Sequence, residues 1–404
     1  MTGLAGKGLA GKGLAGKGLP EAAVRRPLPP FTDELEDFRA AVRRFVEAEL
    51  APRAPEYEAA KWFPNEVFHR LAEMGYLGLK FEERYGGEGG GYLADAVFAE
   101  ELARCGSGGL AAGIGAHTSI AMPPIWKFGT EEQKQRWLVP GIRGEKIGAL
   151  GITEPDAGSD VAGIKTLARR VDGGWVVNGS KTFITNGVRA DFIVTAVKTR
   201  QEGGHHGLSF LVVERGEGVE STAIDKLGWH ASDTALIAFD DVFVPDEHLL
   251  GEENQGFYLI MANFQWERLL MALVSVGGMR ACFERTLAFA RERRAFGRPI
   301  GEHQAIRHKL AEIATTVEAG RAITYDALRR FVEGDDAVRE VTMAKLATQR
   351  SAFEVADTCL QIHGGAGYMR EYGIERAARD ARLGPIGGGT DEIMKEILGK
   401  TLGL

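Results

Sequence analysis

The chain has 404 residues, of which 44% are hydrophobic and 26% are charged. This length predicts two or three domains or one large composite fold, and the composition excludes wholesale disorder and a fibrous architecture. Acidic residues outnumber basic ones by 56 to 49, which argues against nucleic acid as the main partner. We find neither an apolar run of membrane-spanning length nor a signal-peptide pattern, so we expect no membrane span and a cytoplasmic location.

Residues 1–30 differ in composition from the rest of the chain. They contain GLAGK three times in succession, followed by the proline-rich VRRPLPP. A segment so rich in glycine and lysine buries too little apolar surface to offset the entropy lost on ordering it. We therefore expect a flexible low-complexity arm.

Residues 31–150 carry a helical pattern. Asp33 and Glu36 have the spacing of a capping box, and apolar residues then recur on one helical face. The same period continues through FPNEVFHRLAEMG, YLADAVFAEELARC and EEQKQRWLVPGIRG. These segments predict an N-terminal α-helical domain.

Residues 151–250 change to short runs rich in β-branched and aromatic residues. The runs are GWVVNGSKTFITNG, FIVTAVKT, GLSFLVVERG and TALIAFDDVFVP. Asn178 and Gly179 form a dipeptide typical of a two-residue hairpin turn. We expect a central antiparallel β-domain.

Residues 251–404 return to long helical patterns. Four such segments begin at FYLIMANFQWERLLMALVSV, FERTLAFARERRAF, HQAIRHKLAEIA and VTMAKLATQRSAF, with glycine or proline between them. Long helices joined by short turns predict a C-terminal four-helix bundle. The complete chain is therefore predicted to have an α+β fold in the order helices, strands, helices.

Two segments of the predicted β-domain could bind a cofactor. LGITEPDAGSDVAGIKT places Thr153 and Ser159 in glycine-containing turns after a short apolar strand, where hydroxyls and backbone amides suit a phosphate or the edge of a flavin. KTFITNG places Phe183 and Thr185 on the same strand face, and the phenyl ring could stack on a flat ring system. Taken alone, the two segments also fit an ordinary polar turn and an ordinary strand.

Five segments in order give the chain a family resemblance. ITEPDAGSD, KTFITNG, RRAFGRPIGEHQ, QIHGGAGYMREY and IGGGTDEI resemble the signature motifs of the acyl-CoA dehydrogenase family, from about residue 31 to the C-terminus. The resemblance implies the helical, β and four-helix-bundle domains in this order, and a homotetramer with one FAD per subunit. It also implies α,β-dehydrogenation of an acyl-CoA thioester to trans-2-enoyl-CoA, with an electron-transferring flavoprotein as electron acceptor.

The resemblance also implies which residues bind FAD. It places Thr185 near the flavin N5 region and Phe183 against the ring, and it lets Arg293 reach the pyrophosphate bound to a neighbouring subunit. Without it, Arg293 in ARERRAF fits an ordinary solvated helix charge. The full set of implied contacts is Leu150, Thr153, Ser159, Phe183, Ile184, Thr185, Arg293, Gln304, Gln361, Ile362, His363, Gly364, Gly365, Thr390, Asp391 and Glu392.

The reaction requires a carboxylate base beside the substrate, and burial makes a carboxylate more basic. Many family members carry this glutamate directly before the Gly-Thr of the last motif, where this chain has Gly388. Glu267 lies on an apolar helical segment, and QWER matches the position of the base in the long-chain and isovaleryl branches. The resemblance therefore implies Glu267 as base and the Gly388 amide as a donor to the thioester oxygen. It makes Ser159, Tyr258 and Arg268 further substrate contacts.

The substrate class is predicted less finely than the reaction. QWERLL, PIGGGTDEIMKEI and GEENQGFY are most similar to the long-chain branch, which suggests a long or branched acyl chain. The alternatives are an isovaleryl, short branched-chain or other acyl-CoA dehydrogenase, an oxidase, and a non-catalytic member that binds flavin or CoA. His205 and His206 have no acidic or cysteine partner at metal-ligand spacing, so no metal site is expected.

Overall fold

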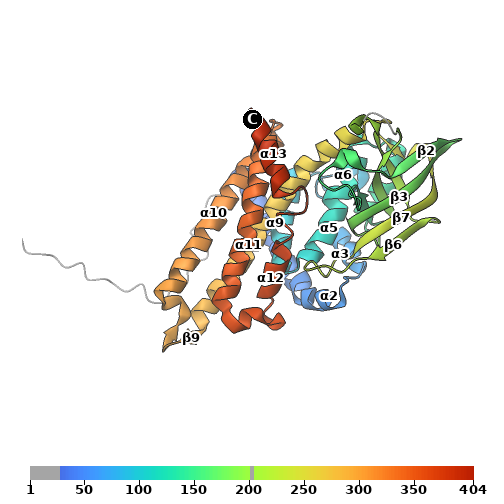
Figure 1. Ribbon diagram of the computed structural model, residues 1–404. Helices are drawn as coiled ribbons and strands as arrows, with labels where there is room; N and C mark the ends of the chain where they lie inside the picture. The colour runs from blue at the N-terminus through green and yellow to red at the C-terminus, as the bar shows by residue number, and fades with distance from the viewer. Residues whose placement is uncertain (1–27, 201–203) are drawn as a thin grey trace, which may run out of the picture.

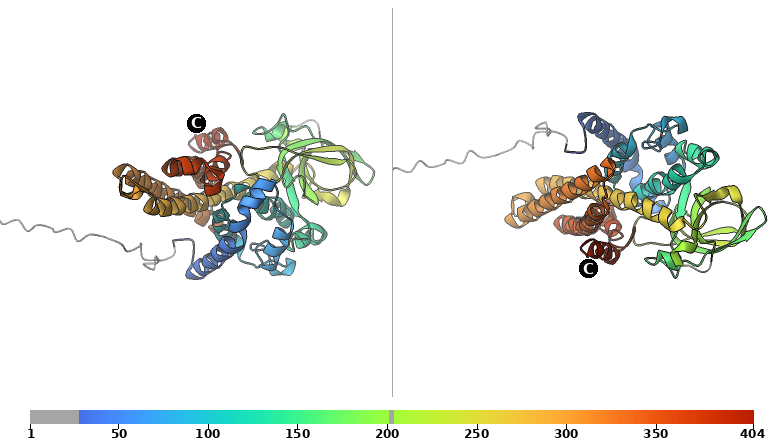
Figure 2. Two further views of the ribbon diagram at one scale, coloured as in Figure 1. Left: turned by 90° about the horizontal axis from the view of Figure 1, so that it is seen from below. Right: turned by 90° about the horizontal axis from the view of Figure 1, so that it is seen from above.

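The computed structural model describes residues 28–200 and 204–404 (Figure 1). The expected flexible arm at residues 1–30 therefore lies outside the described residues, apart from its last three. Helices, then one sheet, then helices again follow along the chain, as predicted. Figures 1 and 2 show the sheet and the C-terminal helices at opposite ends of the molecule.

The N-terminal part is helical, and its first helix begins at a polar cap. The hydroxyl of Thr32 accepts a hydrogen bond from the Leu35 amide at 3.3 Å. The cap is therefore Thr32 and not the expected Asp33, because the backbone of Thr32 is extended, as an N-cap requires, whereas Asp33 is already helical. The helices are α1 (Asp33–Phe45), α2 (Ala54–Ala60), α3 (Glu66–Glu73), α4 (Gly91–Leu102), α5 (Gly108–Gly115), α6 (Met122–Phe128), α7 (Glu131–Gln133) and α8 (Val139–Ile142).

The central part is one sheet with the strand order β6-β7-β3-β2-β4-β5-β8, and β1 pairs with β4. Most pairs are antiparallel as predicted, but β4 is parallel to both β1 and β2. The strands are β1 (Gly148–Gly151), β2 (Leu167–Val171), β3 (Gly174–Thr185), β4 (Phe192–Lys198), β5 (Leu208–Glu214), β6 (Val219–Ala223), β7 (Thr234–Pro245) and β8 (Leu249–Leu250).

The predicted hairpin turn at Asn178 and Gly179 is wrong. Both residues lie inside β3, where the register against β7 shifts between Val177 and Gly179. The Asn178 amide group donates to Asp241 at 2.9 Å, so its polar side chain serves a cross-strand contact. The β2–β3 turn instead falls between Val171 and Gly174, at the sequence Asp-Gly.

The C-terminal part is helical, but its first two predicted segments form one helix, α9 (Gly256–Glu292). A side chain at Gly277 would overlap the backbone of Glu100, so this glycine lets α4 cross α9 closely and does not end the helix. The remaining elements are β9 (Arg294–Ala295), β10 (Arg298–Pro299), α10 (Gln304–Glu333), α11 (Val338–His363), α12 (Ile374–Ala381) and α13 (Asp391–Thr401).

Helix α9 connects the two ends of the molecule. It is the one helix among the described residues whose length and hydropathy would also suit a membrane span. Half of its most apolar stretch is buried inside the fold, where it packs against α4, α10 and α11. This burial explains its apolar character, since helices that are apolar on most faces occupy protein cores.

Candidate active site

The two predicted flavin-binding segments lie together at the end of the sheet. β1 ends at Gly151, and the loop that follows carries Thr153 and Ser159. The Thr182 amide donates to the Thr153 carbonyl at 2.8 Å, which holds this loop against β3 just before Phe183. Leu150, Thr153 and Thr185 are half-buried, Ile184 is buried, and Ser159 is exposed.

Phe183 has an unusual conformation. Its φ is +61°, and it lies where the β3–β7 register shifts between Lys181 and Ile184. A bulky residue at positive φ is strained, and such strain is concentrated at functional sites. The Phe183 side chain is nevertheless 67% exposed, so the strain does not serve the core. An exposed aromatic face beside hydroxyls and loop amides fits the ring system of FAD, which supplies a hydride acceptor when bound.

Glu267 is a half-buried residue of α9 and lies next to the segment that contains Gly388. A Cβ atom built on Gly388 would lie 3.7 Å from Glu267 Oε1, so the carboxylate occupies the space beside that glycine. Oε2 of Glu267 is shielded from solvent and accepts no hydrogen bond from any residue that the structure describes. Burial raises the pKa of Glu267 to about 7, although the charges of Arg268 and Lys345 oppose this rise. The group is therefore a base of near-neutral strength.

Both the backbone conformation at position 388 and the space around it favour glycine. Its φ is +60°, and a side chain there would overlap Met271 Sδ. Among residues 28–200 and 204–404, the Gly388 amide has no hydrogen-bond acceptor. An unused amide next to a buried carboxylate can donate to a substrate oxygen.

Two cationic side chains flank the Glu267 carboxylate. Arg268 Nη2 would lie 3.9 Å from a Cβ on Gly389, and desolvation lowers the pKa of Arg268. Lys345 on α11 donates to the carbonyls of Gly384 and Gly389, and desolvation lowers its pKa to about 8. Lys345 was not among the predicted site residues, although a lysine in the apolar helical segment VTMAKLA is a signal for one.

The last motif caps a helix beside this site. The Thr390 hydroxyl accepts from the Ile393 amide at 3.3 Å and begins α13. Asp391 is buried, and its Oδ2 forms an ion pair with Arg350 at 2.6 Å, whereas its Oδ1 has no hydrogen-bond partner among the described residues. Glu392 is exposed. At the start of α9, Tyr258 is exposed, and its ring centroid lies 6.5 Å from that of His206.

The remaining predicted FAD contacts form a separate group at the far end of α9. His363 stacks on Phe289 with 4.2 Å between ring centroids, which brings the segment Gln361, Ile362, His363, Gly364 and Gly365 close to Arg293. Arg293 and Gln304 are exposed there, whereas Ile362 and His363 are buried. At the rise of an α-helix, Arg293 lies roughly 39 Å from Glu267 along α9. The two groups within one chain therefore do not meet around one cofactor.

Comparisons with known proteins give the family. Models of the acyl-CoA dehydrogenase N-terminal, middle and C-terminal domains match residues 32–145, 149–242 and 254–403. The chain is 38% identical to isovaleryl-CoA dehydrogenase of Solanum tuberosum, over 92% of this chain and 91% of that protein. It is 39% identical to long-chain specific acyl-CoA dehydrogenase of Mus musculus, over 92% and 87%.

Solved structures agree with this assignment. The fold superimposes on the acyl-CoA dehydrogenase of Geobacillus kaustophilus with a TM-score of 0.91 and 40% identity, covering 94% of this chain and 100% of that one. Butyryl-CoA dehydrogenase of Megasphaera elsdenii gives a TM-score of 0.89 and 36% identity, covering 93% and 99%. The resemblance and the predicted three-part fold are confirmed: this chain belongs to the acyl-CoA dehydrogenase family and is an FAD-dependent oxidoreductase.

Proposed function

We propose that this enzyme introduces an α,β double bond into an acyl-CoA thioester and that Glu267 is its base. The observation that carries the proposal is the Glu267 carboxylate beside Gly388, whose shielded Oε2 has no hydrogen-bond partner in the described part of the chain. Glu267 would take the proton from the α-carbon, and FAD held beside Phe183 and Thr185 would supply the acceptor for the hydride of the β-carbon. The product would be trans-2-enoyl-CoA. The Gly388 amide donates to the thioester oxygen and stabilises the charge that develops there.

Replacing Glu267 by glutamine tests this role. The amide cannot accept the proton, so kcat should fall by about 10²- to 10⁴-fold, the usual contribution of a general base. The yellow holoprotein should retain FAD, and its anaerobic bleaching by acyl-CoA should be lost. Glu396→Gln, at an exposed position on α13, is the matched control. Near-normal bleaching of the Glu267→Gln protein would refute the base assignment.

The finer proposal is that the acyl chain is long or branched. Its support is that the chain is similar at 38% and 39% identity to relatives named for isovaleryl and for long-chain substrates. The segment Gly387, Gly388 and Gly389 also places no side chains beside the Glu267 carboxylate. We expect kcat/KM for palmitoyl-CoA or isovaleryl-CoA to exceed that for butyryl-CoA by at least about tenfold. A preference for butyryl-CoA would contradict this proposal.

We also propose an electron-transferring flavoprotein as the electron acceptor. The catalysed reaction leaves two electrons on the enzyme, and a chain solved under the name electron transferring flavoprotein of Acidaminococcus fermentans is 34% identical to this one. Turnover with such a protein should be rapid, and peroxide should form slowly in air. Stoichiometric peroxide at each turnover would instead identify an oxidase. The cytoplasmic location stays a prediction.

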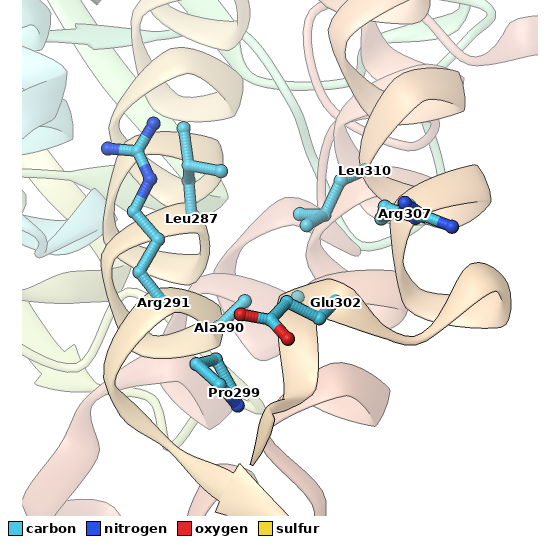
Figure 3. Close-up of a pocket in the computed structure, with 8 residues that line it drawn as sticks. Leu287, Ala290, Arg291, Pro299, Glu302, Arg307 and Leu310 are labelled. Carbon is cyan, nitrogen blue, oxygen red and sulfur yellow. The ribbon is translucent and has the colours of Figure 1, made fainter. Parts of the chain in front are cut away.

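A homotetramer is proposed because Arg293 cannot serve the flavin site of its own chain. Beside it, Leu287, Ala290 and Leu310 line a cavity of about 420 Å³ (Figure 3). At the adjoining β9–β10 turn, Phe296 is 96% exposed. We propose that a second copy covers this end and receives Arg293 at its FAD pyrophosphate. Sedimentation should give four times the chain mass and Arg293→Ala should weaken FAD binding, whereas a monomeric holoprotein would contradict both.

A further inference from the structure

Lys181 and Glu154 form a buried ion pair beneath the proposed flavin site. Lys181 is 0% exposed on β3, two residues before Phe183. Its ammonium group donates to Glu154 Oε1 at 2.7 Å and to the Ile152 carbonyl at 3.0 Å. Desolvation lowers the pKa of Lys181 to about 8, against the charge of Glu154. This pair was not among the residues predicted from the sequence.

Glu154 closes the loop that carries Thr153 and Ser159. Its Oε1 accepts from the Thr166 amide at 2.9 Å, and its Oε2 accepts from the Lys165 amide. The Thr166 hydroxyl then donates to the Ser180 carbonyl at 3.2 Å. Both ends of the loop are therefore held to the part of β3 that contains Lys181.

The same contacts accompany the bulge at Phe183. The register between β3 and β7 shifts between Lys181 and Ile184, and the Thr182 amide donates to the Thr153 carbonyl at 2.8 Å. A carbonyl of the loop is therefore the acceptor for the amide of the residue that precedes Phe183. Because Lys181 holds the neighbouring Ile152 carbonyl, it fixes the loop and the bulge relative to each other.

Stability alone gives a weak reason for such a pair, because burying two charges costs desolvation energy and a well-packed apolar pair is often as stable. We infer that Lys181 is a positioning residue for FAD: through Glu154 and Ile152 it holds the loop with Thr153 and Ser159 in register with Phe183 and Thr185. The inference rests on the flavin placement proposed above. Lys181 itself does not touch the reacting atoms.

The test measures the dissociation constant of FAD and the visible spectrum of the bound flavin. For Lys181→Met we expect FAD to bind at least about tenfold more weakly, with a shifted flavin absorption band, in protein whose circular dichroism is native. Should that variant not fold, the double variant Lys181→Gln/Glu154→Gln removes both charges, keeps hydrogen-bonding groups and carries the same expectation. A folded variant with affinity within twofold of wild type and an unchanged spectrum would overturn the inference.

Two controls separate positioning from general stability and from the flavin placement. Arg39→Met removes another buried ion pair, with Glu100 at 2.8 Å between α1 and α4; it should lower the unfolding midpoint without changing the flavin spectrum. Phe183→Ala tests the placement itself. If Phe183→Ala also leaves the affinity and spectrum unchanged, the proposed site is wrong. If Phe183→Ala changes them and the Lys181 variants do not, only the positioning role fails.

Discussion

At the residue scale, the burial that makes Glu267 basic also destabilises the fold. The folded protein favours the protonated carboxyl group because desolvation raises its pKa to about 7, from an ordinary value of 4.5. The folded state therefore binds more protons than the unfolded chain between these two pH values. Below pH 4.5 the ionisation of Glu267 does not reduce the free energy of unfolding. As the pH rises to about 7, the free energy of unfolding falls by up to about 3 kcal/mol.

Glu267→Gln should remove this pH dependence. Because the amide stays neutral, the variant should gain stability relative to wild type between pH 5 and pH 8, by up to about 3 kcal/mol. Urea unfolding of both proteins at the two pH values measures the change. An equal difference between the proteins at pH 5 and pH 8 would mean that Glu267 has an ordinary pKa in the folded protein.

Gly388→Ala should slow catalysis even though the carboxylate of Glu267 remains. The methyl group would overlap Met271 Sδ and would occupy a backbone conformation with φ of +60°. We expect a loss of about 1–3 kcal/mol in unfolding free energy and a fall in kcat of at least about tenfold, since the amide moves from the thioester oxygen. Urea unfolding and single-turnover flavin bleaching report the two effects. Wild-type values in both would show that this glycine is replaceable.

At the scale of elements, the positive charge of a lysine on α11 acts on the carboxylate base on α9. Lys345 lowers the pKa of Glu267 through its charge and also holds the Gly384 and Gly389 carbonyls. Lys345→Met should therefore move the acidic limb of the kcat/KM profile to higher pH, with about a two- to threefold loss at pH 6.5. At pH 9 the Glu267 carboxylate is ionised in both enzymes. Any difference in kcat/KM that remains at pH 9 therefore comes from the lost hydrogen bonds to the Gly384 and Gly389 carbonyls. An unmoved limb would contradict the charge effect, and Lys345→Arg should retain the wild-type profile.

The elements also show how far the sequence could predict the structure. The apolar segment around Glu267 and the glycine at position 388 were visible as local signals, and the structure places the two side by side. The continuity of α9 was not visible, because Gly277 resembles a helix stop until the crossing by α4 is known. Lys181 and Glu154 are far apart in the sequence, and nothing local to either residue predicts that β1 and β3 bring them together.

At the scale of the whole molecule, Asp380 joins the three parts of the chain. Its carboxylate on α12 accepts from the Gly108 amide of α5 at 2.9 Å and from the Trp229 amide, between β6 and β7, at 2.6 Å. A Cβ atom at Gly108 would lie 2.6 Å from the Trp229 ring nitrogen. The contact between α5 and the segment that joins β6 to β7 therefore leaves no room for a side chain at this position. Desolvation, and then repulsion by Glu58, raises the pKa of Asp380 to about 6.

Asp380→Ala should loosen this junction while leaving the active-site groups in place. The variant leaves two half-buried amides without acceptors. A fully buried unpaired amide costs about 1–3 kcal/mol, and partial contact with water keeps each of these near the lower end of that range, so the loss of unfolding free energy should be about 2–4 kcal/mol. Asp380→Asn keeps one carbonyl oxygen at the same position and should lose about half as much. Urea unfolding measures the free energies, and bleaching at low temperature checks that the folded variant remains active. A loss below about 0.5 kcal/mol for Asp380→Ala would mean that packing alone holds the three parts together.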